Sequence, residues 1–249
     1  MSAALRSELL KQRTTRTILQ LPLWMVGLVA LVVVLHVFSL DVATLTSRDG
    51  QLKVLGWGTS VGALFAALLG ALSITGEIRH GTIRPTFLAT PKRARVIIAK
   101  LAASALAGLA IGLLAEALTA GLESAGLATR GIHLALSAGD YVQLLAGGAF
   151  AAALWGAIGV GVGAIVRNQV GAIVGLCVWL LLIETTLIGN VPGAGKFVPG
   201  AGAGALAGAI QTQNASKLLT PALGALLLAT YAAAATAAGL ITTERHDIN

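Results

Sequence analysis

Six long apolar runs separated by short polar segments form the dominant pattern of this chain. Each run has about the 20 residues that an α-helix needs to cross the hydrocarbon core of a bilayer. We therefore expect six transmembrane helices, over residues 19–40, 54–75, 101–122, 141–166, 169–189 and 218–242. The only acids inside these runs are Glu116 in the third and Glu184 in the fifth. The pattern predicts an all-α polytopic membrane protein in which residues 1–249 form a single transmembrane domain.

The composition agrees with this fold class. Hydrophobic residues make up 56% of the chain and charged residues 11%, whereas soluble domains average about 25% charged residues. A soluble domain of this length would still need a polar surface, because its surface area grows almost as fast as its mass. The composition therefore excludes a soluble globular protein.

The positions of Lys and Arg predict the orientation. With both termini on the same side of six spans, twelve of the 17 basic residues lie on the side of the termini and five on the other. Basic residues accumulate on the cytoplasmic side of membrane proteins, so we expect both termini to be cytoplasmic. The net charge of +7 is then a signal of topology, and no nucleic-acid partner is expected. A multi-pass protein of a bacterial cell membrane, plasma or inner, fits this pattern.

Glycines repeat at a spacing of four residues within several spans. The pairs are Gly58/Gly62, Gly108/Gly112, Gly159/Gly163 and Gly171/Gly175. Small residues at this spacing let helix backbones approach closely in lipid. Although some pairs arise by chance in so glycine-rich a chain, together they favour a compact bundle.

Two segments outside the spans are expected to lie at the membrane surface. Residues 1–17 contain Leu5 and Leu9 one turn apart among basic residues, which is typical of an amphipathic interfacial helix on anionic lipid; a frayed basic tail is the alternative. The loop 191–217 is expected outside, and its apolar stretch Ala201–Ile210 is too short to cross. This stretch is predicted to be re-entrant or interfacial, with a flexible small-residue loop as the alternative.

The segment 76–100 between the second and third spans is a dense polar island on the predicted cytoplasmic side. Thr82 can cap a helix through its hydroxyl, and Pro85 would fall in the first turn, where its missing N–H costs little. Pro91 disfavours helix at the residue before it. The sequence therefore predicts a helix of about two turns over Ile83–Ala89.

This short helix would lie across the membrane surface with Ile83, Phe87 and Leu88 as its apolar contacts. A stiff rod joined to two spans transmits a push to both, whereas a floppy loop absorbs it. An ordinary solvated charged loop is the alternative interpretation.

Sequence motifs for nucleotide or metal chemistry are missing. The nearest approach to a phosphate-binding loop, Gly193-Ala194-Gly195-Lys196, lacks the first glycine and the Ser or Thr after the lysine. The four histidines are scattered, and the single cysteine, Cys177, has no near companion. We expect no catalytic residue, no metal site and no cofactor bound by this chain, which is therefore not predicted to be an enzyme.

Three polar residues fall inside the predicted spans. Glu116, Glu184 and His36 all map to the outer half. Because ionisable groups at this depth usually face a cavity or a partner, a shared outer vestibule on a substrate path is one interpretation. The other is that all three are hydrated near the interface.

The polar island also carries a family pattern. It reads Glu77-x-x-x-Gly81-Thr82-x-x-x-x-x-Leu88-x-x-Pro91-x-Arg93 between the second and third of six spans. This resembles the type-2 ABC transporter permease family, whose members have a basic amphipathic N-terminal segment, six spans and a re-entrant stretch before the last span. The resemblance covers essentially the whole chain.

The resemblance implies that Thr82–Pro91 is a coupling helix that docks on a separate ATP-hydrolysing subunit. The chain would pair with a second permease copy, identical or related, and with two ATPase subunits that bind ATP and Mg. Together they would export a hydrophobic or amphipathic substrate such as a drug, peptide or lipid-like molecule. The implied ATPase contacts are Glu77, Arg79, Gly81, Thr82, Ile83, Arg84, Phe87, Leu88, Pro91, Arg93, Arg167 and Asn168.

Other function classes stay open at this point. An ion-coupled transporter or channel would use Glu116 and Glu184 and would conduct without ATP. A non-transporting membrane scaffold would recruit a cytosolic protein through the same polar island. A membrane enzyme acting on lipids would need a cluster of polar catalytic residues at one interface, which the sequence does not suggest.

Overall fold

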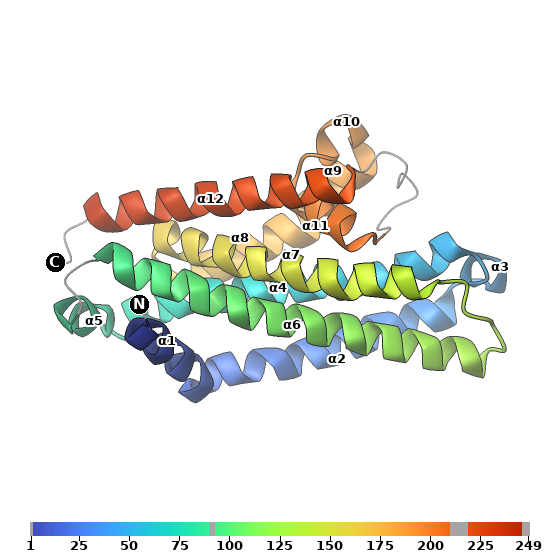
Figure 1. Ribbon diagram of the computed structural model, residues 1–249, viewed down its shortest axis with the longest axis horizontal. Coiled ribbons are helices and arrows are strands. Elements are labelled where there is room, and N and C mark those ends of the chain that lie inside the picture. The colour runs from blue at the N-terminus through green and yellow to red at the C-terminus, as the bar shows by residue number, and fades with distance from the viewer. Residues whose placement is uncertain (1, 90–92, 210–218, 246–249) are drawn as a thin grey trace.

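The computed structural model describes residues 2–89, 93–209 and 219–245, and this part of the chain is helical apart from short connections. Its helices pack as an elongated bundle (Figure 1). The elements are α1 (Ser2–Thr14), α2 (Arg16–Ser39), α3 (Val42–Leu45), α4 (Arg48–Arg79), α5 (Ile83–Ala89), α6 (Arg93–Thr129), α7 (Ala138–Val166), α8 (Gln169–Val178), a π-helical segment (Trp179–Ile183), α9 (Glu184–Asn190), α10 (Pro192–Gly195), α11 (Pro199–Ala207) and α12 (Pro221–Arg245).

Six helices in the described residues are long and apolar enough to cross a membrane, which confirms the predicted number and character of the spans. They are α2, α4, α6, α7, α12 and the continuous run from α8 through α9. The chain therefore has the architecture of a multi-pass membrane protein. Most of these helices extend beyond the expected spans, and α6 begins at Arg93, so residues 93–100 are helical rather than part of a loop. No glycine or proline interrupts residues 93–100, so nothing there opposes a helix.

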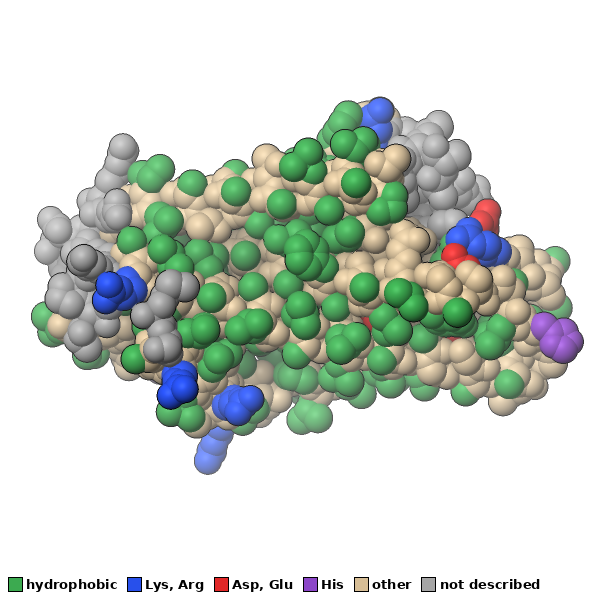
Figure 2. Space-filling view, viewed as in Figure 1, with side chains coloured by type: hydrophobic (Ala, Val, Ile, Leu, Met, Phe, Trp, Pro, Cys, Tyr) green, Lys and Arg blue, Asp and Glu red, His purple; other side chains and the backbone are tan. Residues whose placement is uncertain are grey.

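The bundle has central and peripheral helices. In the most apolar window of each span, 78% of the residues of α4 and 67% of those of α7 are buried, against 22% in α2, in α8–α9 and in α12. The peripheral helices instead direct large apolar side chains outward, as the broad hydrophobic surface in Figure 2 shows. That division is what a bundle surrounded by lipid requires, because only lipid or another apolar surface can cover such a belt.

Glycines bring α4 and α7 into backbone contact. A Cβ added at Gly159 would lie 2.0 Å from the carbonyl oxygen of Ala67, and one at Gly70 would lie 2.1 Å from that of Gly156. No side chain fits at such distances, so only glycine permits this approach.

Three of the four predicted glycine pairs are helix contacts. Gly58/Gly62 and Gly108/Gly112 face α6 or α7 neighbours, and Gly159/Gly163 faces α4. The pair Gly171/Gly175 makes no helix contact in the described chain, since nothing there lies within 4 Å of a Cβ at Gly175. Gly171 contacts only the preceding turn, because α8 is a peripheral helix.

The start of α1 and the end of α12 lie at the same end of the bundle, together with α5 (Figure 1). The connection α3 and the short helix α10 lie toward the opposite end. On the face seen in Figure 2, most of the visible basic side chains lie toward the two ends and the surface between them is largely apolar. The end that carries α5 is called the α5 end below.

Helix α1 forms where an N-terminal helix was expected, and a polar side of it faces the bundle. Glu8 and Gln12 are buried against the bundle, whereas Leu10 is 62% exposed and Leu5 and Leu9 are half-buried. Polar partners on α4 and α6 account for this orientation, as described below. The expected contact of Leu5 and Leu9 with the membrane surface stays a prediction.

The segment after α9 is partly described. Helix α11 is a buried nine-residue helix that packs beside α7 and α12, and it ends at Gly208, whose φ of +69° favours glycine. Residues 210–217 of the expected outer loop, including the end of the predicted re-entrant stretch, lie outside the described residues.

Candidate functional site

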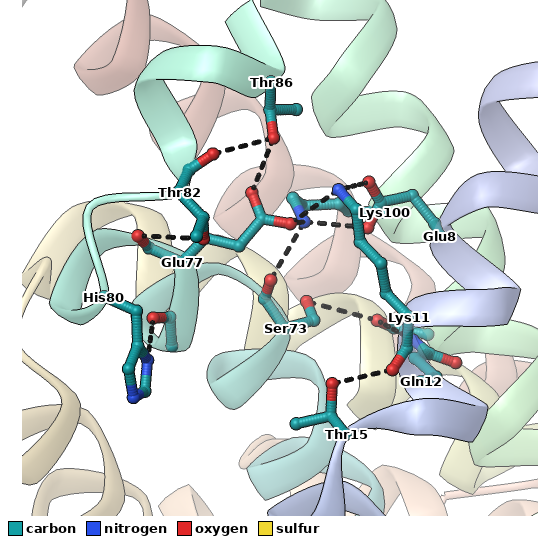
Figure 3. Close-up of polar contacts among 12 residues, drawn as sticks. Glu8, Lys11, Gln12, Thr15, Ser73, Glu77, His80, Thr82, Thr86 and Lys100 are labelled. Carbon is teal, nitrogen blue, oxygen red and sulfur yellow. Dashed lines mark hydrogen bonds and ion pairs between the residues drawn. The ribbon is translucent and has the colours of Figure 1, made fainter.

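Four charged side chains meet inside the α5 end of the bundle (Figure 3). Lys100 Nζ lies 2.8 Å from Glu8 Oε2 and 2.7 Å from Glu77 Oε1, and it also donates to the Ser73 carbonyl at 3.0 Å. Lys11 Nζ lies 2.7 Å from Glu8 Oε1 and 2.8 Å from Glu77 Oε1. Two acids and two lysines thus form a charge-balanced cluster, called the joint below, that links α1, α4 and α6.

Lys100 and Glu77 are largely buried members of the joint. The Lys100 side chain is 1% exposed and that of Glu77 is 11% exposed, whereas Lys11 is partly open to solvent. Burial by itself lowers the pKa of Lys11, but hydrogen bonds to Glu77 and Glu8 outweigh it and leave the pKa above its ordinary value. Removing one member of a buried pair typically costs about 3–5 kcal/mol, because its partner stays buried and unpaired. Lys100 is therefore the member whose loss should matter most.

Helix α5 and the turn before it are hydrogen-bonded to a member of the joint, Glu77. The backbone N–H of Thr82 donates to the Glu77 carbonyl at 2.9 Å, and the Thr86 hydroxyl contacts Glu77 Oε2 at 3.5 Å. Gly81 has a φ of +69°, the left-handed conformation that lets the chain turn from α4 into α5. Glu77 therefore contacts the turn through its backbone carbonyl, and α5 and the buried lysine through its carboxylate.

The capping role expected for Thr82 is not what its hydroxyl does. Instead of accepting from a helix N–H, it donates to the Glu77 carbonyl at 3.4 Å. The tight turn at Gly81 brings Thr82 back over the end of α4, which makes that carbonyl the nearest acceptor. In the structure a helix, α5, spans Ile83–Ala89.

The two described apolar side chains of α5 point in different directions. Ile83 is buried against Ile74, Val96 and Ile97 of α4 and α6, whereas Leu88 is 83% exposed. Helix α5 is thus anchored by one side chain and presents another to its surroundings. The side chains of Arg84, Phe87 and Arg93, and the whole of Pro91, lie outside the described residues.

A cavity of about 440 Å³ lies beside the joint. Its lining comes from α1, α2, α4 and the α5 segment, with Gln169 at the start of α8. Glu8, Lys11 and Glu77 lie on its wall, so the joint is exposed on this side to whatever occupies the cavity.

The turn between α7 and α8 lies at the same end. Arg167 has a φ of 56° and closes α7, and the Asn168 side chain accepts from the Gly171 N–H at 2.9 Å to cap α8. Arg79, at the end of α4, donates from Nη1 to Gln169 Oε1 at 3.4 Å. The structure thus brings the Arg167–Asn168 turn near the end of α4, as a shared contact surface would require.

The three polar residues predicted to lie in the outer half separate into two sites. Glu116 is fully buried between α4 and α7, where its Oε1 accepts from the Thr59 hydroxyl at 2.6 Å and touches Gly148. Its Oε2 has no hydrogen-bond partner in the described chain. His36 and Glu184 do not join it but line one cavity of about 130 Å³. The expected vestibule therefore includes His36 and Glu184, and it reaches Glu116 only through Thr59, which lines the cavity.

Glu184 is held by a local irregularity of the fifth span. The π-helical segment Trp179–Ile183 precedes it, and Trp179 Nε1 donates to Glu184 Oε1 at 2.7 Å across five residues. Single-turn π segments inside α-helices recur at functional sites. Here the wider turn brings the indole and the carboxylate into hydrogen-bond contact.

Sequence reasoning missed several residues of these sites. Glu8 and Lys100 were counted only as loop or tail charges, although an acid in a basic segment and a lysine beside a long apolar run were available signals. Glu123 was not considered, yet it is fully buried and neither of its oxygens has a partner in the described chain. Among the described residues, no group of three His, Cys, Asp or Glu is placed to hold a metal ion.

Comparisons of the sequence with protein-family models and with curated proteins gave no match.

Proposed function

We propose that this chain is the transmembrane permease subunit of an ATP-driven exporter of the type-2 ABC class. The end that carries the termini and α5 would face the cytoplasm, in keeping with the twelve basic residues assigned to that side. Two copies, or this chain and a related permease, would pair with two ATPase subunits in the cell membrane. ATP and Mg would bind in those subunits and not in this chain.

One observation carries the proposal: α5 is anchored to the bundle and yet exposed on its outer side. Ile83 and the Glu77 contacts hold α5 to α4 and α6, while Leu88 is left almost fully open. A partner that seats Leu88 would push against α5, and the joint would pass the force to α1, α4 and α6. A solvated loop would have no reason to be held by a buried charge cluster.

The turn at Arg167 and Asn168 supports the same partner as a second, smaller contact. It lies near the end of α4 through the Arg79–Gln169 hydrogen bond. Arg79 is exposed and Glu77 faces inward, so within the predicted contact set Arg79 would touch the partner while Glu77 would position α5.

Site-directed crosslinking tests this proposal. In a Cys177→Ala background, Leu88→Cys carrying a photoreactive crosslinker is expressed in its native cells, and the products are identified by mass spectrometry. We expect a product with a protein that contains a phosphate-binding loop and hydrolyses ATP. Val42→Cys is the matched control, because Val42 is an exposed apolar residue at the opposite end.

Two outcomes would contradict the proposal. One is labelling of Leu88→Cys by a membrane-impermeant thiol reagent from outside intact cells, since a cytoplasmic ATPase could not reach it there. The other is a Leu88→Asp variant that still assembles with the ATPase as well as the unaltered chain does.

A second candidate function is an ion-coupled transporter or channel. The unpartnered Oε2 of buried Glu116 favours it, because a buried carboxyl without a full set of partners often faces an ion or proton path. This function predicts flux without ATP that Glu116→Gln abolishes. Flux that requires the ATPase and survives Glu116→Gln would exclude it.

A further inference from the structure

The cavity that contains Glu184 holds a buried acid without a counter-charge. Glu184 is 2% exposed, and its Oε2 lies so close to Gly200 that a Cβ there would be 1.9 Å away. Its Oε1 accepts from Trp179. Within the described residues no Lys, Arg or His forms an ion pair with Glu184, although a buried carboxylate normally needs such a partner. A cationic ligand could therefore supply the ion-pair partner that Glu184 does not find among these residues.

Aromatic rings lie on the same wall. His36 and Trp57 stand with ring centroids 4.9 Å apart and an interplanar angle of 51°, and Trp155 completes the aromatic lining. His36 Nδ1 donates to the Val32 carbonyl at 2.8 Å, which fixes the ring. Aromatic faces beside a carboxylate form the environment that a quaternary or protonated amine prefers.

One lysine also lines the cavity and limits the charge it accepts. Lys53 lies four residues before Trp57 on α4, about 6 Å nearer to the α3 end at the helical rise. It forms no ion pair with Glu184 in the described chain. A ligand with one positive charge can reach Glu184 beyond the lysine, whereas a second positive charge would be repelled.

The cavity is too small for a whole drug-sized molecule but has an apolar exit. Its volume is about 130 Å³, and drug sites usually measure about 300–1,000 Å³. Leu181 lines it and is 54% exposed on a peripheral helix. A head group therefore fits inside while an attached alkyl tail passes Leu181 into the surrounding apolar surface.

We infer that this cavity binds the head group of a singly charged cationic amphiphile, an amine or quaternary ammonium with an apolar tail. Glu184 supplies the charge, His36 and Trp57 supply aromatic faces, and the exit at Leu181 accommodates the tail. That the bound cation is transported cargo rests on the proposed function, whereas binding itself requires no ATPase.

The test uses the full chain alone, in lipid nanodiscs made of zwitterionic lipid. Radiolabelled decyltrimethylammonium is the probe, decyl sulfate and decylphosphocholine are the charge controls, and empty nanodiscs give the background. We expect saturable binding of the cation only. Glu184→Gln should weaken it about tenfold, equivalent to about 1.4 kcal/mol, while the amide oxygen can still accept from Trp179.

Matched variants separate charge recognition from general damage. Glu123→Gln removes another buried acid outside the cavity and should leave binding unchanged. Lys53→Gln should bind the cation at least as tightly as the unaltered chain. Trp57→Leu should weaken binding about fivefold through loss of an aromatic face, and it keeps the test decisive if Glu184→Gln does not fold.

The inference is overturned if decyl sulfate binds as well as the cation. It is also overturned if Glu184→Gln and Glu123→Gln bind alike, or if Lys53→Gln binds more weakly. These results are independent of the crosslinking at Leu88. Loss of ATPase docking would leave a cation-binding membrane protein, and loss of cation binding would leave the coupling proposal intact.

Discussion

Replacing Lys100 with methionine should destabilise the bundle strongly, because it removes the most buried charge of the joint. Methionine fills a similar volume, so the main change is electrostatic. The variant leaves Glu8 and Glu77 with Lys11 as their one remaining lysine in the cluster, and one buried negative charge is uncompensated. Breaking a buried pair in this way costs about 3–5 kcal/mol. With a shift of about 2–4 °C per kcal/mol for a chain of this size, the midpoint of thermal unfolding should fall by about 6–20 °C.

The assay is thermal unfolding of the purified chain in nanodiscs, followed by tryptophan fluorescence. The double variant Lys100→Met with Glu77→Gln restores the charge balance and leaves the Glu8–Lys11 pair, so it should recover much of the lost stability. Lys196→Met is the matched control, because this lysine forms no ion pair in the described chain and its Nζ lies over the Phe197 ring. A Lys100→Met midpoint within about 2 °C of the unaltered chain would refute the reasoning, as would a double variant whose loss equals the sum of the two single losses.

Three further predictions concern other parts of the structure. Gly159→Ala places a methyl group against the Ala67 carbonyl, so it should cost about 1–3 kcal/mol in the same unfolding assay, whereas Gly175→Ala, which meets nothing within 4 Å, should be neutral. Glu116→Gln keeps an acceptor for the Thr59 hydroxyl and should yield normal amounts of monodisperse protein on size-exclusion chromatography; aggregation would show that the carboxylate itself is structural. The pKa of Lys11 is raised in the folded chain, so its contribution to stability is complete below the unfolded-state pKa of about 10.4 and is lost as the pH rises through the higher folded-state pKa. The difference in unfolding midpoint between the unaltered chain and Lys11→Gln should therefore be constant up to about pH 10. Above that pH the difference should shrink.

The apolar spans and α5 were predictable because the evidence for each is local. Each of the six apolar runs lies within a short window of sequence, and so do Gly81 and Pro85, which mark the bend before α5 and its first turn. The joint was not predictable in this way, since Glu8 and Lys100 are 92 residues apart. The i, i+4 spacing of Leu5 and Leu9 predicts only a face for the membrane surface, whereas the side of α1 that meets the bundle is set by polar partners on other helices.

The outer sites show the same limit. Position along a span placed Glu116, Glu184 and His36 at similar depth, but depth says nothing about which face of a helix a residue occupies. Helix packing directs Glu116 toward α4 and α7, and the π-helical turn shapes the surroundings of Glu184. The separation of these acids into two sites could be found only once the helices were assembled.

The glycine contacts between α4 and α7 have a mechanical consequence. Two backbones that touch without intervening side chains cannot slide or tilt against each other without steric overlap, since close-packed interiors yield in discrete steps and not continuously. These two helices should therefore move together as one rigid unit. By the same criterion α6 and α12, which meet the backbone of α7 at Gly108 and Gly161, belong to this rigid centre. Under the proposed function, opening and closing is then left to α2 and α8–α9, and crosslinks that fix these two outer spans to the centre should stop transport even when every contact at the α5 end is intact.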